Sequence, residues 1–308
     1  MHAHDSSPGI SLALSRRRLL RRVLGLGSAT LSARAVARGS FGGASQATID
    51  ETAALEVPVA IRGRGYRLVQ NWDFRRTVTD AEKLHGEFYT RYIYEQGRLD
   101  HFNDEWQRYR DRDNHVFDGD ALSLVARVPT QLAHGLIESG MLRSKWYGQY
   151  GYFEGRMKVP GGRGLWPAFW LIPQDATTPP EIDIVEIVNN GRDTTRDSFH
   201  FVHQGLPDDR PATYSRLRSN HVYRPGFDYK DDFHTFAVDW TADRVRHFVD
   251  DVLVVDRPFR WLHVSGADAG AAHVLVNLAV GGKWPGPPIR REDFPAKLQL
   301  QHIRVWQR

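Results

Sequence analysis

The 308-residue sequence contains no cysteine, so disulfide bonds and metal sites built on thiolates are excluded. It also lacks any apolar run of the about 18 to 20 residues that a membrane-spanning helix requires. No internal repeat or low-complexity block follows residue 66, which excludes repeat architectures. Aromatic residues, by contrast, make up 11% of the chain and include nine Trp. This aromatic content suits a folded protein that handles sugars or extended polymers.

The first 37 residues differ from the rest of the chain. Three arginines, Arg16–Arg18, precede a mildly apolar stretch rich in Gly, Ser and Ala, and the small residues at 35–37 form a candidate cleavage site. This pattern resembles a twin-arginine export signal. The alternative is an Arg-rich arm that binds nucleic acid. We predict a signal peptide over residues 1–37 and export to the periplasm or to the outside of the cell.

The charge balance depends on this leader. The whole chain has a net charge of +4 and a pI of about 9.3. Residues 1–37 hold six Arg and one Asp, a net charge of +5, so their removal changes +4 to −1. The basic pI therefore gives no support for a nucleic-acid partner. After signal cleavage we expect a soluble monomer that binds neither nucleic acid nor membrane.

The remaining chain reads as a lead-in followed by one large domain. Residues 38–65 are rich in Gly, Ser, Ala and Thr and are predicted to be a linker or lead-in, and residues 66–308 form the domain. One segment, 77–92, is a helical candidate. Apolar and polar residues alternate with the period of a β-strand in seven segments: 121–128, 150–159, 198–203, 233–240, 245–251, 273–280 and 298–306. This predicts an all-β fold, a sandwich of two antiparallel sheets packed face to face.

The segment EIDIVE, residues 181–186, places three carboxylates inside an apolar strand. In a regular strand Glu181 and Asp183 share one face, and Glu186 points into the opposite, apolar face, where an isolated carboxylate is very costly. A β-bulge at Ile184 and Val185 returns Glu186 to the face of the other two carboxylates. The sequence therefore predicts a bulge at this point.

With the bulge, the Cα atoms of Glu181 and Glu186 lie about four strand steps apart, roughly 13 Å. Two Glu side chains that lean together across this span reach about 5 Å, the carboxyl separation of retaining glycoside hydrolysis. Asp183 lies between them, where it can hydrogen-bond one Glu. Two alternatives remain open: an acidic outer face of a surface strand, and a calcium site made of three carboxylates.

The motif GGRGLWPAFWLIP (161–173) precedes EIDIVE, and together they closely resemble glycoside hydrolase family 16. The resemblance covers residues 66–308, and its further motifs are GYFEGRMKVP, FHTFAVDWTADRVRHFVDD, VNLAVGGKWPG and FPAKLQLQHIRVWQ. It implies a concanavalin-like jelly roll with a concave substrate cleft. EIDIVE is similar to the bulged motif of laminarinases, agarases and carrageenases. By this resemblance Glu181 is the nucleophile, Asp183 the assisting carboxylate and Glu186 the acid/base.

The same resemblance implies a set of substrate-binding residues. Trp166 and Trp170 are four residues apart in an extended segment, hence on one face, and family members line the sugar cleft with tryptophans here. The alternative is that one of them belongs to the core. His200 is predicted to reach the cleft from the neighbouring strand. Trp284, in a Gly/Pro loop, and Asn277 are the other predicted cleft residues.

The resemblance implies an endo-acting retaining hydrolase of β-1,3- or β-1,3-1,4-glucan that needs no cofactor. Some members bind a structural calcium, for which the sequence identifies no ligands here. Cations near the cleft segments favour an acidic exopolysaccharide instead, unless they are solvated rim charges: Arg143, Arg163, Arg192 and Lys283. A galactan hydrolase, a transglycosylase and a non-catalytic lectin of the same fold also remain open.

Overall fold

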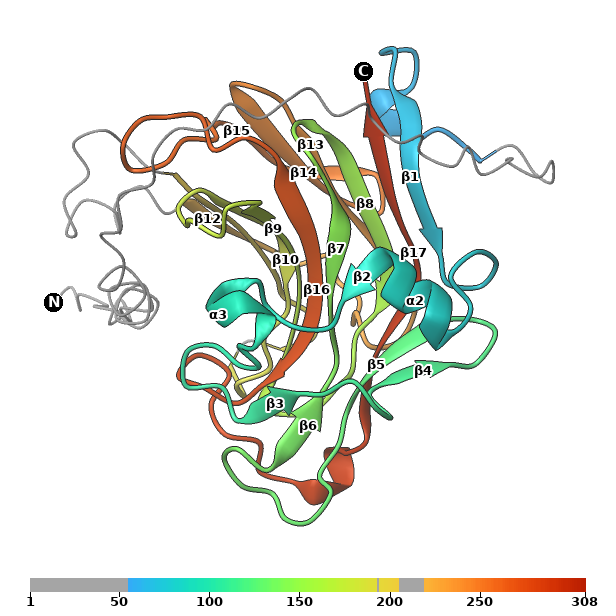
Figure 1. The fold of residues 1–308 in the computed structure, drawn as a ribbon, viewed down its shortest axis with the longest axis vertical. Coiled ribbons are helices and arrows are strands. Elements are labelled where there is room, and N and C mark those ends of the chain that lie inside the picture. The colour runs from blue at the N-terminus through green and yellow to red at the C-terminus, as the bar shows by residue number, and fades with distance from the viewer. Residues whose placement is uncertain (1–54, 193, 205–218) are drawn as a thin grey trace, which may run out of the picture.

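The computed structural model describes residues 55–192, 194–204 and 219–308, which form two large antiparallel sheets packed face to face (Figure 1). This confirms the predicted sandwich. The predicted signal peptide, 1–37, and most of the predicted lead-in, 38–65, lie outside the described residues and stay predictions.

Sheet A runs in the order β15-β14-β13-β8-β17-β5-β4, and β1 pairs with β17. Its strands are β1 (Arg67–Asp73), β4 (His115–Phe117), β5 (Leu122–Ala126), β8 (Gly151–Lys158), β13 (His234–Trp240), β14 (Arg244–Val249), β15 (Val252–Pro258) and β17 (Ala296–Gln307). Sheet B runs in the order β12-β11-β10-β9-β16-β7-β2. Its strands are β2 (Phe88–Tyr89), β7 (Met141–Gly148), β9 (Leu165–Pro173), β10 (Glu181–Glu186), β11 (Ser198–His203), β12 (Ser219–Tyr223) and β16 (Ala272–Val280).

The remaining elements are short. Two strands, β3 (Gln107–Tyr109) and β6 (Ile137–Ser139), pair in parallel beside the sandwich. The helical turns are η1 (Val59–Ile61), α2 (Ala81–Glu87), α3 (Tyr94–Gly97) and η2 (Arg291–Asp293). Across the described ranges, no helix has both the length and the apolar character needed to cross a membrane.

All seven predicted strands form, and the predicted helix is shorter than its pattern. The strands that match the seven predicted segments are β5, β8, β11, β13, β14, β16 and β17. The helix predicted over 77–92 occupies only Ala81–Glu87. Asp80 begins it, because its side chain accepts a hydrogen bond from the Lys83 backbone N–H, and the chain becomes extended at Phe88, which ends it.

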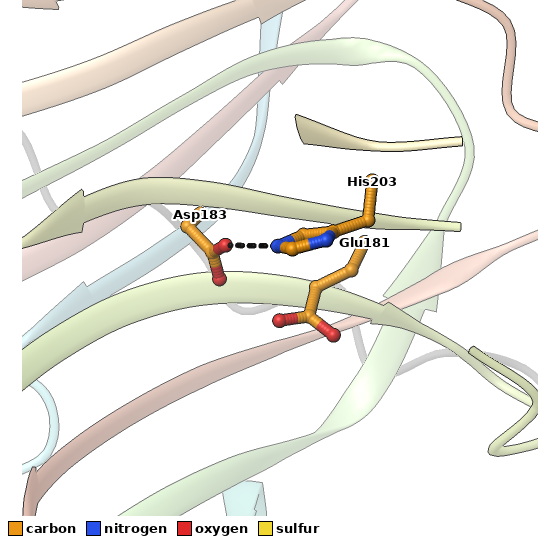
Figure 2. Close-up of side chains that lie close together, drawn as sticks. All are labelled: Glu181, Asp183 and His203. Atoms are coloured by element: carbon orange, nitrogen blue, oxygen red, sulfur yellow. Dashed lines mark ion pairs between the residues drawn. The ribbon is translucent and has the colours of Figure 1, made fainter. Parts of the chain in front are cut away.

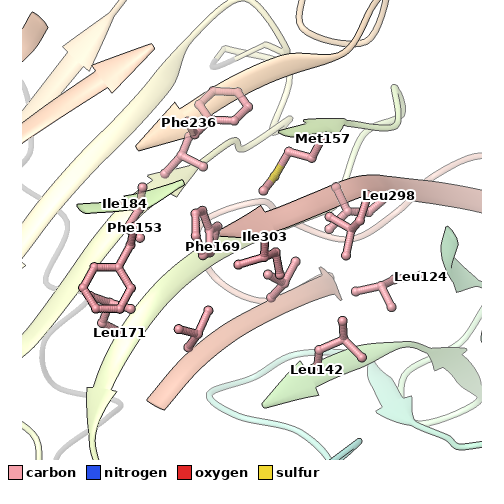
Figure 3. Packing of buried hydrophobic residues seen from close by; sticks show 14 of the residues in the cluster. Leu124, Leu142, Phe153, Met157, Phe169, Leu171, Ile184, Phe236, Leu298 and Ile303 are labelled. Atoms are coloured by element: carbon pink, nitrogen blue, oxygen red, sulfur yellow. The ribbon is translucent and has the colours of Figure 1, made fainter. Parts of the chain in front are cut away.

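The core lies between the two sheets, where alternate residues of each strand meet. Phe169 of β9 is fully buried there, and its ring packs close to Gly155 of sheet A. Figure 3 shows neighbouring core side chains from both sheets: Leu124, Leu142, Phe153, Met157, Leu171, Ile184, Phe236, Leu298 and Ile303. Burial of this continuous apolar layer fixes which face of each strand is left to form a cleft.

The described part of the lead-in, residues 55–65, packs on the outer face of sheet A. Ile61 is buried in an apolar cluster with Tyr152 of β8 and Trp306 of β17. Arg64 donates a hydrogen bond to buried Asp239 at 2.9 Å. These contacts attach residues 55–65 to the sandwich, so an independent linker describes this part poorly, while the boundary at residue 66 stays a prediction.

Candidate active site

The bulge predicted in EIDIVE is present in β10. The β10 pairings with β9 and β11 both shift in register after Asp183, and Ile184 is the extra residue. Glu181, Asp183 and Glu186 then pair with residues of β11 that alternate in steps of two: His203, Phe201 and Phe199. Because residues two apart share a face, the three carboxylates point to the same side of sheet B. Ile182 and Ile184 enter the core.

The three carboxylates line one pocket on the open face of sheet B. Their residues are 2%, 2% and 4% exposed, so the pocket keeps them largely from bulk water. The β11 partners of Glu181 and Glu186 are His203 and Phe199, which lie four residues apart. Four strand steps correspond to roughly 13 Å between the Cα atoms of the two Glu residues. This is the spacing predicted from the sequence.

Glu181 lies at the start of β10, just after the loop from β9. The Thr178 hydroxyl donates a hydrogen bond of 3.1 Å to Glu181 Oε2. A hydrogen bond to a carboxylate favours its ionised form and fixes its rotamer, and both suit a nucleophile. Thr178 belongs to the segment preceding EIDIVE, and it also lines the pocket.

Asp183 is held by His203, a residue that the sequence analysis missed. His203 Nε2 lies 3.2 Å from Asp183 Oδ2, and Figure 2 shows this contact with the Glu181 carboxylate on the same side. His203 pairs with Glu181 across the strands, so once the bulge is placed, the β11 register assigns His203 to the cleft face. That register, rather than any local motif, is the signal that finds this residue.

Glu181, Asp183 and His203 also offer ligand atoms within 4.8 Å of one another, which makes them a candidate metal group. Calcium takes oxygen ligands, so the imidazole does not fit the structural calcium that some family members hold. The predicted role of Glu181 as a nucleophile also requires an oxygen that stays open to the reacting carbon. We therefore interpret the His203–Asp183 contact as an ion pair within the site, and the absence of a cofactor stays a prediction.

Glu186, at the far end of β10, contacts Trp166 of β9. The Trp166 indole N–H donates a hydrogen bond of 3.0 Å to Glu186 Oε1. Trp166 lines the pocket as predicted, and the ring of Trp284 stands edge-on to it at 5.5 Å between centroids. Trp284 also packs on Phe199. Trp284, predicted to lie in the cleft, is not among the described lining residues and instead packs against Trp166 and Phe199.

Trp170 and Asn277 lie side by side on β9 and β16, and both line the pocket as predicted. The Trp170 indole N–H donates to Asn277 Oδ1 at 2.8 Å, and Asn277 Nδ2 donates to the Tyr109 hydroxyl at 2.9 Å. Burial, followed by the Glu105 carboxylate, raises the pKa of Tyr109 well above its usual value, so the phenol keeps its proton. This series of hydrogen bonds fixes the orientation of the Trp170 ring.

His200 does not lie in the cleft, and this prediction was wrong. It shares the inner face of β11 with Ser198 and Val202 and is 1% exposed between the sheets. Polarity alone would assign Ser198 and His200 to the open face and Phe199 and Phe201 to the core. The opposite holds, because the polar groups of Ser198 and His200 satisfy each other in the core, while both Phe side chains pack beside Trp166 on the cleft face.

The segment 92–105 contributes part of the pocket lining. Its lining residues include Tyr92, Tyr94 and Phe102, whose rings form a cluster that reaches Trp170. The carboxylate residues of the lining are Glu95, Glu105, Glu181, Asp183 and Glu186. Lys and Arg are absent from the described residues that line it.

The four cations near the cleft segments therefore do not form the pocket wall. Lys283 pairs with Asp104 at 3.1 Å on the surface, and the Arg143 guanidinium covers the ring of Tyr89. Neither they nor Arg163 and Arg192 contribute to the described lining. The electrostatic argument for an acidic polymer loses its support.

Replacing His203 tests how Asp183 is held. We expect His203→Ala to lower kcat roughly 10- to 100-fold, because Asp183 loses the contact that holds it, and a misplacement of about 1 Å costs up to about 10²-fold. His203→Gln keeps a donor near the position of Nε2 and should retain most of the rate. Steady-state kinetics on a glucan measure both variants, and equal rates for the two would contradict this role.

Buried histidines predict loss of stability in acid. Burial lowers the pKa of His200 from 6.5 to about 4, that of His302 to about 3 and that of His247 well below 6.5. Below pH 6.5 these three histidines bind protons in the unfolded chain but stay neutral in the folded chain. Each histidine should then remove about 1.4 kcal/mol of unfolding free energy per pH unit. Burial raises the pKa of Glu154 from 4.5 to about 7, so between these pH values the folded chain binds a proton that the unfolded chain does not. This offsets the destabilising effect of one of the three histidines.

Urea unfolding between pH 7 and pH 5 measures this dependence. The free energy of unfolding should fall as pH decreases, and His247→Phe should reduce the slope by about one proton. A free energy that stays constant over this range would contradict the prediction.

The sequence and the fold were compared with known proteins. The model of "Glycosyl hydrolases family 16" matches residues 101–287. A β-glucanase of Rhodothermus marinus is 33% identical over 175 residues, which cover 51% of this chain and 57% of that protein's length. A kappa-carrageenase of Pseudoalteromonas carrageenovora is 25% identical over 281 residues, covering 84% and 69%.

A solved structure of the Rhodothermus marinus laminarinase superposes with a TM-score of 0.61 at 28% identity, covering 79% of this chain and 97% of that one. The family match spans β10, both tryptophans of β9 and Asn277 of β16. The chain therefore belongs to glycosyl hydrolases family 16.

Proposed function

We propose that the chain is a retaining, endo-acting hydrolase of a neutral β-linked glucan, with β-1,3- or β-1,3-1,4-linkages. The observation that carries this proposal is the bulged β10. It brings Glu181 and Glu186 to one face, four register steps apart, with Asp183 between them. Two Glu side chains that lean together across this span can reach the carboxyl separation of a retaining glycosidase, about 5 Å.

In the first step Glu181 attacks the anomeric carbon, and the bond to the leaving oxygen breaks as Glu186 gives that oxygen its proton. A glycosyl ester on Glu181 results. In the second step Glu186 removes a proton from a water molecule, whose oxygen attacks the same carbon and releases the sugar and Glu181. Two inversions retain the β-configuration. Asp183, which His203 contacts, lies between Glu181 and Glu186 and orients their side chains.

The pocket lining supports a neutral polymer. Five acidic residues and no Lys or Arg are among the described lining residues, so an anionic chain would meet like charge. Trp166 and Trp170 present the flat apolar surfaces that pyranose C–H faces pack against. The β-glucanase and laminarinase among the relatives agree with a glucan, whereas the kappa-carrageenase keeps a galactan in the test.

Product analysis of the purified 308-residue chain tests the proposal. Candidate substrates are laminarin, mixed-linkage β-glucan, agarose, carrageenan and an acidic exopolysaccharide. We expect short oligosaccharides from a β-glucan, with the new reducing ends first appearing as β-anomers by ¹H NMR. First-formed α-anomers would refute retention, and cleavage of only the acidic polymers would refute the neutral substrate.

The same experiment separates the other activities. Products longer than the substrate would identify a transglycosylase, and binding without turnover would identify a lectin. Export by a twin-arginine signal and a monomeric state remain part of the proposal. Detection of a chain cleaved after residue 37 outside the cytoplasm, and its mass by light scattering, test them.

A further inference from the structure

The catalytic bulge leaves one backbone residue without a partner in the sheet. Ile184 has no Cα partner in the register of β10 with either β9 or β11, and its side chain is fully buried in the core. A bulged residue loses its place in the ladder, and a buried backbone carbonyl needs another hydrogen-bond donor.

His200 supplies that donor from the next strand. Its Nδ1 lies 2.6 Å from the Ile184 carbonyl oxygen, which can only accept, so Nδ1 carries the proton. Nε2 of the neutral ring is then an acceptor, and the Ser198 hydroxyl, 3.0 Å away, donates to it. The Tyr229 hydroxyl, 2.9 Å from Ser198 Oγ, donates in turn to Ser198. The chain runs in one direction, from Tyr229 to the bulge.

The environment keeps this imidazole neutral. His200, Ser198 and Tyr229 are all at most 1% exposed. Burial is the main cause that lowers the pKa of His200 to about 4; the hydrogen bond to the Ile184 carbonyl opposes this shift, and the charges of His221 and Arg257 add to it. The single-donor tautomer that the Ile184 carbonyl requires is therefore the stable form near neutral pH.

We propose that His200 is a positioning residue that fixes the catalytic bulge, and so places the Glu186 carboxylate. Only Ile184 and Val185 separate Asp183 from Glu186, so the Ile184 carbonyl orientation sets where the following residue leaves the strand. A slip of one residue would send Glu186 to the core face. This inference rests on the proposed function, because it concerns the residue assigned to proton transfer.

Two substitutions separate the hydrogen bond from the volume of the side chain. His200→Phe keeps a ring in the core and removes the donor to Ile184. His200→Asn keeps an N–H close to the position of Nδ1. The matched control is Val202→Ala, because Val202 lies two residues along the same face of β11 in the same core and pairs with Ile182 instead of with the bulged residues.

The kinetic test uses laminarin or the β-glucan cleaved by the wild type, and a dinitrophenyl β-glycoside whose leaving group needs no proton. For His200→Phe we expect kcat on the glucan to fall about a hundredfold with KM within about twofold of wild type, because misplacement by about 1 Å has this effect. The burst rate with the dinitrophenyl substrate should fall much less. His200→Asn should recover most of kcat on the glucan, and Val202→Ala should keep it.

A spectroscopic readout needs no turnover. The Trp166 indole N–H bonds to Glu186, so its ¹H–¹⁵N resonance reports the position of that carboxylate. It should shift in His200→Phe, move little in His200→Asn and stay unchanged in Val202→Ala. If His200→Phe does not fold, Ser198→Ala, which removes the donor to Nε2, should shift the same resonance and lower kcat.

The outcomes are distinct. Wild-type kcat and an unshifted Trp166 resonance in folded His200→Phe would overturn this inference while leaving the hydrolase assignment intact. Equal losses on both substrates, with no recovery in His200→Asn, would reduce His200 to a structural role. Inactivity of the wild type on every glycan would instead refute the proposed function, and the Trp166 resonance would still decide whether His200 fixes the bulge.

Discussion

Replacing Glu181 with Gln should abolish glucan hydrolysis, with a fall in kcat of ~10⁴-fold or more, because loss of a nucleophile removes the covalent route. The amide has nearly the shape of the carboxylate, and its oxygen can still accept the hydrogen bond from Thr178. We therefore expect the fold and glycan affinity to persist. Reducing-sugar release measures turnover, and binding to immobilised glucan measures affinity.

The control for Glu181→Gln is Glu82→Gln, which makes the same change of charge at an exposed position of α2. It should retain wild-type kcat. A Glu181→Gln enzyme with undiminished turnover would remove the two-carboxylate mechanism altogether. A variant that neither folds nor binds glycan would show instead that Glu181 supports the structure.

Replacing Glu186 with Ala should produce a different defect. General acid–base catalysis contributes about 10²–10⁴-fold, so kcat on glucan should fall by about that factor. A dinitrophenyl glycoside needs no proton for its leaving group, so Glu181 should still form the glycosyl ester. Hydrolysis of that ester lacks its base, and turnover should stall after a burst.

Azide then tests the assignment directly. A small anion can enter the space left by the Glu186 side chain beside Trp166 and attack the glycosyl ester without a base. We expect azide to restore turnover in Glu186→Ala and to give a β-glycosyl azide, identified by NMR. An α-azide would contradict retention, and the absence of rescue would contradict the acid/base role. Azide should leave Glu181→Gln inactive.

The strands and the three carboxylates follow from local sequence because their signal has a period of two. All seven segments in which alternation predicted a strand form one, and the break of alternation at Glu186 predicted the bulge. A buried carboxylate on the apolar face is so unfavourable that one extra residue was the simplest repair. The bounds of the helix at 81–87 were predicted too widely, because caps such as Asp80 decide where a short helix begins.

What the sequence by itself determined, then, is the sandwich, the bulged β10 and the face that carries Glu181, Asp183 and Glu186. Only the tertiary structure decided which polar residues reach that face. His200 and His203 are alike in local sequence, and the pairing of β11 with the bulged strand sends one under the bulge and the other to Asp183. The segment 92–105, with Glu95 and Glu105, also joins the pocket only through long-range packing. Polarity predicts exposure only where the core offers no hydrogen-bond partner, and here the core offers Ser198 and the Ile184 carbonyl.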